Sequence, residues 1–152
     1  MIYFEKRILS IGDIHGQPDK LEKLLKKSEY DSSNDLLILL GDYVDRCFKN
    51  IESLNLVKKL EEQGAIILKG NHEQLLQYAI IDLLNGKPSG SNVEVFIDCG
   101  GVNICNEIKN LNRAQLIGIY EYVANLLLYY EIEEKHPFNL NILFIKLGIS
   151  NG

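Results

Sequence analysis

Three short stretches of the sequence gather side chains that can bind metal ions. Residues 12–16 read GDIHG, residues 41–46 read GDYVDR and residues 70–73 read GNHE. Together they offer oxygen donors from aspartate and asparagine and nitrogen donors from histidine, a mixture that suits Mn, Fe or Zn better than all-oxygen calcium sites or all-thiolate sites. Two such ions sharing one carboxylate would activate water against a phosphate ester. The three stretches therefore predict a site for metal-assisted hydrolysis.

A β-α-β-α-β unit is predicted to position these stretches. Residues 7–11, 35–40 and 65–68 are short, mostly aliphatic runs, as in strands buried on both faces, and each run ends at one of the three stretches. Apolar residues recur at helical spacing after Pro18, a favourable first helical position, and after Asn50, a suitable N-cap. Right-handed crossovers would make the strands parallel and bring the stretches to the carboxyl edge of one sheet, where ligands of open α/β sheets bind.

The rest of the chain is predicted to be mainly helical. A third helix is expected to start at Asn71, the simplest N-cap there, and to stop at Gly86, with its dipole favouring an anion at the amino end. The later elements are expected to be a strand at residues 93–97, a bend at Gly100 before a short helix, a long helix at residues 113–130 and a strand at residues 142–145.

Composition favours one globular domain with a real core. The chain has 152 residues, of which 46% are hydrophobic. Its net charge of −5 provides no broad basic surface for a nucleic-acid backbone, so we expect no nucleic-acid partner. The amino terminus lacks a leader pattern and the longest aliphatic run, residues 36–40, is too short for a bilayer, so we expect a cytoplasmic protein without a membrane partner. Three cysteines without C-x-x-C spacing are expected to be reduced thiols.

The ordered motifs resemble those of the calcineurin-like metallophosphoesterases, and specifically the serine/threonine phosphoprotein phosphatase branch of bacteria and phages. Residues 97–101 are similar to that branch's asparagine-glycine-glycine turn, and residues 143–149 to its later strand ending in His-Ala-Gly. The resemblance implies an α/β fold of the metallophosphoesterase type, a β-sandwich wrapped by helices. Residues 1–152 would form a single, incomplete domain of this kind, truncated with much of the second sheet missing.

The same resemblance implies a pair of divalent ions and their ligands. Asp13 and His15 would hold the first ion, Asp42 would bridge both ions, and Asn71 would bind the second through its amide oxygen. Mn is the first choice of metal, with Fe or Zn as alternatives. An anionic bridge is physically required because two dications about 3.5–4 Å apart repel each other strongly.

Catalytic roles follow from the resemblance in the same way. Arg46 would clamp phosphate oxygens, and Asn71 and His72 would also border the phosphate. His72 would protonate the departing oxygen, with Asp45 bonded to its other ring nitrogen. Taken singly, each residue has a plainer interpretation, as a turn or cap, a surface histidine or an exposed ion pair. What favours a functional site is that all of these residues follow predicted strands, in the order that the family has.

The sequence departs from the family pattern at several positions. Lys146 stands where the family has a metal-binding histidine, and a protonated lysine has no lone pair for a cation. Another histidine ligand and a second arginine would fall after Gly152, so the second metal site is expected to be weakened and turnover by this chain alone weak or absent. Cys47 replaces a glycine that follows the Asp-Arg pair, which could change the aim of Arg46. A truncated reading frame is the simplest explanation of the early stop.

Three functions are compatible with these residues. The leading prediction is a metal-dependent phosphomonoesterase acting on phosphorylated serine or threonine of proteins, or on a small phosphoester. The alternative is a symmetrical bis(5'-nucleosyl)-tetraphosphatase, whose relatives resemble this chain but usually have Asp in place of Glu73 and lack an equivalent of Asp45. A different class is a catalytically silent module that binds phosphate or one metal. The substrate, the metal and the oligomeric state stay open at this point.

Overall fold

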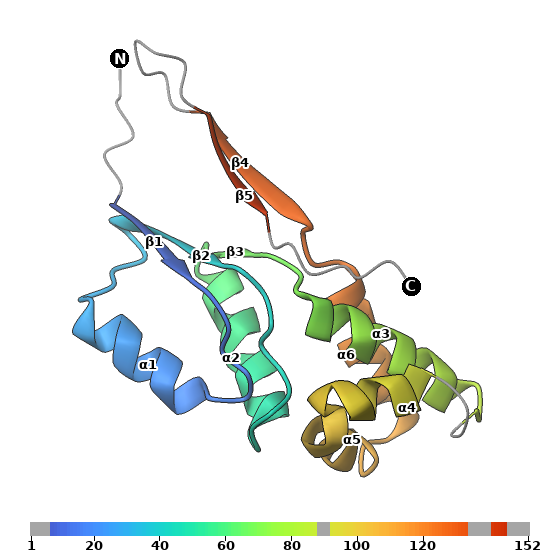
Figure 1. Cartoon of the computed structure of the whole chain (residues 1–152). Helices are drawn as coiled ribbons and strands as arrows, with labels where there is room; N and C mark the ends of the chain where they lie inside the picture. The colour runs from blue at the N-terminus through green and yellow to red at the C-terminus, as the bar shows by residue number, and fades with distance from the viewer. Residues whose placement is uncertain (1–6, 88–91, 134–140, 146–152) are drawn as a thin grey trace.

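The computed structural model describes residues 7–87, 92–133 and 141–145. Its elements, in chain order, are β1 (Arg7–Ile11), α1 (Pro18–Lys27), β2 (Asp35–Leu39), α2 (Asn50–Glu62), β3 (Ile66–Ile67), α3 (Asn71–Leu84), α4 (Asn92–Phe96), the π-helical turn η1 (Ile97–Gly101), α5 (Val102–Ile108), α6 (Arg113–Ala124), β4 (Tyr129–Glu133) and β5 (Asn141–Ile145). Figure 1 shows α1 and α2 beside the β1–β3 strands, and α3 to α6 gathered on the other side of the molecule.

The predicted β-α-β-α-β unit is confirmed. The strands lie in the order β1-β2-β3 and both pairings are parallel, with Arg7 opposite Asp35 and Ile38 opposite Ile66. An ion pair of 2.8 Å between Arg7 and Asp35 joins the starts of β1 and β2. All three strands therefore run toward the same edge of the sheet, which is the edge where the three motif stretches begin.

One face of this sheet packs against α1 and α2. Parallel neighbours joined by right-handed crossovers place both helices on that face, and α1 and α2 contact each other. The shared core is built from alternate strand residues and the apolar stripes of the two helices, including Leu37, Leu39, Ile67, Leu21, Leu25, Leu54 and Val57. The expectation that every strand is buried on both faces is wrong for the edge strand β1, where Ser10 is exposed and Ile8 only half-buried.

Two of the expected helix caps are wrong. Pro18 does open α1, as predicted. Lys49, however, holds the N-cap position of α2, with Asn50 as the first helical residue, and Gly70 holds that position in α3, with Asn71 first. In both helices a glutamate carboxylate bonds backbone N–H groups at the start of the helix, so neither asparagine is needed as a cap.

The later half differs more from the sequence prediction. Residues 93–97, expected to be a strand, lie in α4 and η1, because Val93 and Phe96, three residues apart, are buried together while Val95 is exposed. The bend at Gly100 before a short helix is confirmed, with φ of 109°. The long helix expected at residues 113–130 ends at Ala124.

The chain leaves α6 early because it pairs with the end of β3. Leu127 forms a parallel bridge with Leu68, and its carbonyl accepts a hydrogen bond of 2.6 Å from the N–H of Lys69. The following strand β4 pairs antiparallel with β5, which confirms the final strand, and Figure 1 shows this hairpin extending away from the helices. Across the described ranges, no helix combines the length and apolar character needed to cross a bilayer.

Candidate metal centre

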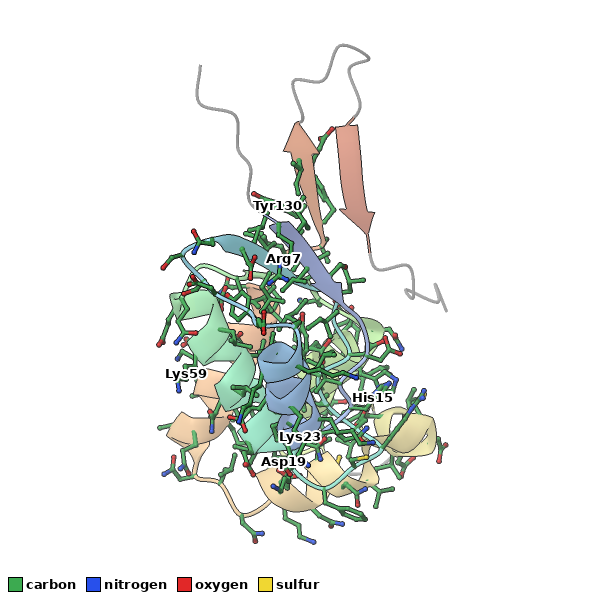
Figure 2. All side chains as sticks on the ribbon, turned by 90° about the vertical axis from the view of Figure 1, so that its left-hand side faces the viewer. Arg7, His15, Asp19, Lys23, Lys59 and Tyr130 are labelled. Carbon is green, nitrogen blue, oxygen red and sulfur yellow. The ribbon has the colours of Figure 1, made fainter. Side chains whose placement is uncertain are left out.

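The first two motif loops are fastened to each other through their backbones. The N–H groups of Ile14 and His15 donate to the carbonyl of Asp42 at 3.0 and 2.9 Å, and the N–H of Gly16 donates to the carbonyl of Tyr43 at 2.8 Å. Figure 2 shows Arg7, the first residue of β1, close to the β4–β5 hairpin, and His15, in the loop after β1, farther from it. The main chain itself therefore sets the separation between the first and second motifs.

The third motif approaches the second just as closely. A side chain at Gly41, whose φ is 100°, would collide with the backbone of Gly70, and a side chain at Gly70 would collide with Asp42. Both positions need glycine because the two loops touch backbone to backbone. The turn before α3 can therefore reach the Asp42 carboxylate.

Several residues of these loops adopt a left-handed backbone. The φ angles are 47° at His15, 60° at Asp42, 78° at Asp45 and 63° at Arg46. Such conformations cost about 1–3 kcal/mol each for residues other than glycine and gather at functional sites, where the surroundings hold them. Only Glu29 shares this property among the other non-glycine residues that the structure describes.

Asp13, His15 and Asp42 form a cluster that could hold a metal ion. Their potential ligand atoms all lie within 4.8 Å of one another. The Nδ1 atom of His15 lies 2.8 Å from the carbonyl oxygen of Val44, which accepts its proton and leaves the lone pair on Nε2. That Nε2 atom is buried without a hydrogen-bond partner, 3.6 Å from a carboxylate oxygen of Asp13. A buried imidazole nitrogen facing carboxylates in this way fits a divalent cation.

Asn71 adds an amide to the same cluster. Its amide NH₂ group donates to the two carboxylate oxygens of Asp42 at 3.2 and 3.3 Å. The carboxylate also accepts a 3.2 Å hydrogen bond from the backbone N–H of His72, so it lies at the amino end of α3. The anion expected at this helix end is thus the side chain of Asp42.

His72 and Asp45 form a buried pair beside the cluster. The Nδ1 atom of His72 lies 2.5 Å from a carboxylate oxygen of Asp45, and Asp45 is completely buried. The hydrogen bond to Asp45 raises the pKa of His72 above its ordinary value. The rings of His15 and His72 meet edge to face with their centroids 4.9 Å apart. His72 is therefore next to the metal-binding imidazole candidate.

Arg46 stands at the exposed margin of this arrangement. Its side chain is exposed, and its positive charge opposes the rise that burial causes in the pKa of Asp45. Its backbone N–H donates to the carbonyl of Gly100 at 3.4 Å. The left-handed backbone falls on Asp45 and Arg46 and not on Cys47, so the structure does not require a glycine at residue 47.

Sequence reasoning missed the contribution of Glu73 to the geometry of the site. This side chain is fully buried and accepts backbone hydrogen bonds of 2.8 Å from Asp42, 2.8 Å from Tyr43 and 2.9 Å from Gly70. Burial raises its pKa to about 7, while the N–H donors oppose that rise. Its position three residues after Gly70, typical of a capping box, was the available signal.

The structure brings all seven of the predicted site residues into one region, with Arg46 at its margin. Of the residues predicted for a second ion, Asp42 and Asn71 lie in the described part of the chain. Lys146 lies outside the described residues. Its effect on the second ion stays a prediction.

The chain belongs to the calcineurin-like phosphoesterase family, whose model matches residues 6–144. Among curated proteins, it is 44% identical over 63 residues to a symmetrical bis(5'-nucleosyl)-tetraphosphatase of Mannheimia succiniciproducens, a match that covers 41% of this chain and 22% of that protein. The match thus spans less than a quarter of this relative's length. The names of the curated relatives agree with the alternative prediction, the symmetrical tetraphosphatase, better than with the leading one.

Solved structures support the fold. A crystal structure of a candidate diadenosine tetraphosphatase matches with a TM-score of 0.56 and 22% identity, covering 82% of this chain and 45% of that one. A protein serine/threonine phosphatase from Saccharomyces cerevisiae matches with a TM-score of 0.54 and 20% identity, covering 82% and 34%. The chain therefore has an α/β fold that forms part of a metallophosphoesterase fold, with a small parallel sheet and surrounding helices. The complete sandwich stays a prediction.

Proposed function

We propose that this protein is a metal-dependent hydrolase of phosphate esters or anhydrides, with symmetrical dinucleoside tetraphosphates as the leading substrate class. One observation carries the proposal most directly. The unpartnered Nε2 atom of His15 lies in a cluster with Asp13 and Asp42, directly beside the buried His72–Asp45 pair. Cation ligands and a proton donor are the two elements that phosphoester hydrolysis needs together.

Four residues would hold the ions. Asp13 and His15 would bind the first ion and Asp42 would bridge the two. Asn71 would contribute its amide oxygen to the second ion, with the amide turned so that the oxygen and not the NH₂ group faces Asp42. Mn is our first choice because the donors are mixed oxygen and nitrogen. Bound divalent ions at such a site supply Lewis-acid activation of water and of phosphoryl oxygens.

The remaining residues would manage the proton and the phosphate. His72 would give its proton to the departing oxygen, and its bond to Asp45 both orients the ring and favours the protonated form. Arg46, exposed beside this pair, would hold phosphate oxygens through its planar set of N–H donors. The buried Asp45 would thus serve as the orienting partner of His72.

A phosphoprotein substrate is the second candidate, and two residues favour it. Asp45 pairs with His72 at 2.5 Å, and Glu73, not Asp, follows the Asn-His pair. Both features distinguish the serine/threonine phosphatase branch, which the motifs resemble, from the tetraphosphatases. Cytoplasmic location and the absence of nucleic-acid and membrane partners are kept as predictions with either substrate.

A direct assay separates these candidates. The purified chain, loaded with Mn²⁺, is incubated with diadenosine tetraphosphate and, separately, with phosphoserine and phosphothreonine peptides. Symmetrical cleavage would release ADP as the single nucleotide product, measured by anion-exchange chromatography, whereas phosphatase activity would release inorganic phosphate from the peptides. Cleavage of the peptides alone would reverse our ranking. Binding of Mn²⁺ by titration calorimetry without turnover of any substrate would favour the silent binding module.

A further inference from the structure

Glu107 of α5 bonds the start of α2 from a distance of 57 residues along the chain. One carboxylate oxygen accepts the N–H of Asn50 at 3.0 Å and the other accepts the N–H of Ile51 at 2.9 Å. The residue at the local N-cap position, Lys49, makes no side-chain cap hydrogen bond. A carboxylate at a helix amino end is favourable for the helix dipole, so Glu107 replaces the missing local cap.

The same carboxylate also fixes the orientation of the Asn50 side chain. The amide nitrogen Nδ2 of Asn50 donates to Glu107 at 2.7 Å, and it also donates to the carbonyl of Cys47 at 2.9 Å. Because an ionised carboxylate only accepts hydrogen bonds, the NH₂ group must face Glu107 and the amide oxygen must face the other way. That oxygen accepts the backbone N–H of Asp45 at 2.7 Å. Asn50 is completely buried, so these bonds have no competing solvent.

Two further contacts join the Ile97–Ile108 region to the same loop. The carbonyl of Gly100 accepts the N–H of Arg46 at 3.4 Å, and Asn103 donates to the carbonyl of Arg46 at 3.5 Å. Asp45 and Arg46 are the residues whose φ angles are 78° and 63°. Their left-handed backbone is therefore held from the side of η1 and α5.

We infer that Glu107 is a positioning residue for the site: through Asn50 it holds the backbone of residues 45–47 in the conformation that turns Asp45 toward His72 and Arg46 toward a phosphate. The inference rests on the proposed function for its catalytic meaning. Its structural part, the control of the Asp45 backbone by a residue of α5, is independent of substrate and metal. A plain helix cap would stabilise α2 without this control.

Amide hydrogen exchange in the metal-free protein tests the structural part. Each backbone N–H of interest has a different acceptor: Asp45 donates to Asn50, whereas Tyr43 donates to Glu73. We expect E107A to speed exchange at Asp45 by about 10-fold or more relative to Tyr43, measured by NMR, because only the first acceptor loses its orientation. Replacement of the exposed Glu94 of α4 by alanine is the matched control and should change neither rate.

Equal acceleration at Asp45 and Tyr43, or no acceleration at either, would mean that Glu107 is only a helix cap and would overturn the inference. Should E107A fail to fold, E107Q decides the question by the same comparison. Gln keeps only one acceptor oxygen, and when that oxygen accepts the N–H of Ile51 its NH₂ group faces the NH₂ group of Asn50, so we expect the same selective acceleration at Asp45 with a smaller size.

Phosphate binding tests the link to the site. With the Mn²⁺-loaded protein and inorganic phosphate as the probe, we expect E107A to weaken phosphate binding about 10-fold while Mn²⁺ affinity changes less than about threefold, since outer contacts of this kind have effects of that order. Phosphate affinity equal to that of the wild type would overturn the positioning role. If the wild type binds neither Mn²⁺ nor phosphate, the proposed function fails, and the exchange experiment still decides the role of Glu107.

Discussion

The two sides of the candidate site are supported by different parts of the chain. On the metal side, His15 is fixed by the carbonyl of Val44 and Asp42 by Glu73 and the turn before α3, all within the first 73 residues of the chain. On the phosphate side, the Asp45–Arg46 backbone is held by Asn50 and Glu107, with Glu107 supplied by α5. The metal ligands thus depend on the β-α-β-α-β unit and the first turn of α3, whereas the phosphate-handling residues depend also on the later helices.

This division has a physical basis in chain connectivity. The three motif loops follow parallel strands whose register brings their ends together, so the metal cluster needs no help from distant sequence. The left-handed backbone of Asp45 and Arg46, in contrast, takes part of its support from Glu107, Gly100 and Asn103, which lie in the later helical region. Changes on the metal side should therefore affect ion binding, and changes on the phosphate side should affect turnover at unchanged ion binding.

The largest effect is expected for Asp42→Asn. Loss of the bridging charge leaves two cations without an anion between them, and we expect Mn²⁺ affinity and turnover to fall by more than about 100-fold, beyond the range of outer contacts. The variant should still fold, because asparagine tolerates the left-handed backbone at φ of 60° and keeps one oxygen for the N–H of His72. Titration calorimetry with Mn²⁺ measures the loss.

Glu22→Gln, an exposed position on α1, removes one negative charge elsewhere and serves as the control. If Asp42→Asn bound two Mn²⁺ ions as tightly as the control, the metal side would not be organised around Asp42.

The next largest effect is expected for His72→Gln, and it should appear on the phosphate side only. Removal of the proton donor should lower turnover by about 10²–10⁴-fold, the usual contribution of general acid catalysis. Mn²⁺ affinity should stay within a few-fold of the wild type because the ligand cluster keeps Asp13, His15 and Asp42. Steady-state kinetics and calorimetry on one preparation give both quantities.

His15→Gln is the mirror experiment and should weaken Mn²⁺ binding first, since Nε2 of His15 is the candidate ligand. Equal loss of Mn²⁺ affinity in His15→Gln and His72→Gln would show that the site is not divided into a metal side and a phosphate side.

The sequence predicted the metal side better than the phosphate side because the metal side depends on patterns that are local in the sequence. The parallel strands and the grouping of Asp13, His15 and Asp42 follow from apolar runs that end at short motifs. The support of Asp45 by Glu107 joins residues far apart in the sequence, and no local pattern marks it. Likewise, residues 93–97 read as a short apolar run, a case in which strand and helix look alike until packing partners are known.

The early end of α6 shows the same limit. Leu126 continues the apolar period of the helix and is buried, yet the next residue, Leu127, pairs with Leu68 of the sheet edge. Tertiary pairing therefore decided the helix boundary against the local pattern. The N-caps of α2 and α3 were misplaced by one residue for the related reason that Glu107 and Glu73 bond the N–H groups at these helix starts.

A moderate effect is expected for Glu73→Gln, which tests whether the first turn of α3 holds the metal side. The carboxylate of Glu73 accepts three backbone N–H groups through its two oxygens. In Gln an NH₂ group replaces one of these oxygens, so the N–H groups bonded to that oxygen lose their acceptor. We expect the free energy of unfolding to fall by about 1–3 kcal/mol, the cost of an unsatisfied buried polar group. Mn²⁺ affinity should fall about 10-fold because the Asp42 backbone loosens.

Urea unfolding with and without Mn²⁺ measures both effects, and Glu62→Gln at the exposed end of α2 provides the control. Unchanged stability would mean that the backbone contacts between the loops suffice without Glu73.

The smallest effect is expected for Cys47→Gly, which restores the residue that the family pattern has after the Asp-Arg pair. Glycine is valuable where the backbone is left-handed, but here that conformation belongs to Asp45 and Arg46, and Cys47 takes part in the loop network through its backbone N–H and carbonyl. Removing the side chain should therefore leave phosphate affinity and turnover within about threefold, and should lower the free energy of unfolding by about 0.5–1 kcal/mol because glycine gains entropy in the unfolded chain. Thermal unfolding and phosphate titration of the Mn²⁺-loaded protein measure the two quantities. A gain in turnover of tenfold or more would show that the cysteine side chain, and not the support from α5, limits the aim of Arg46.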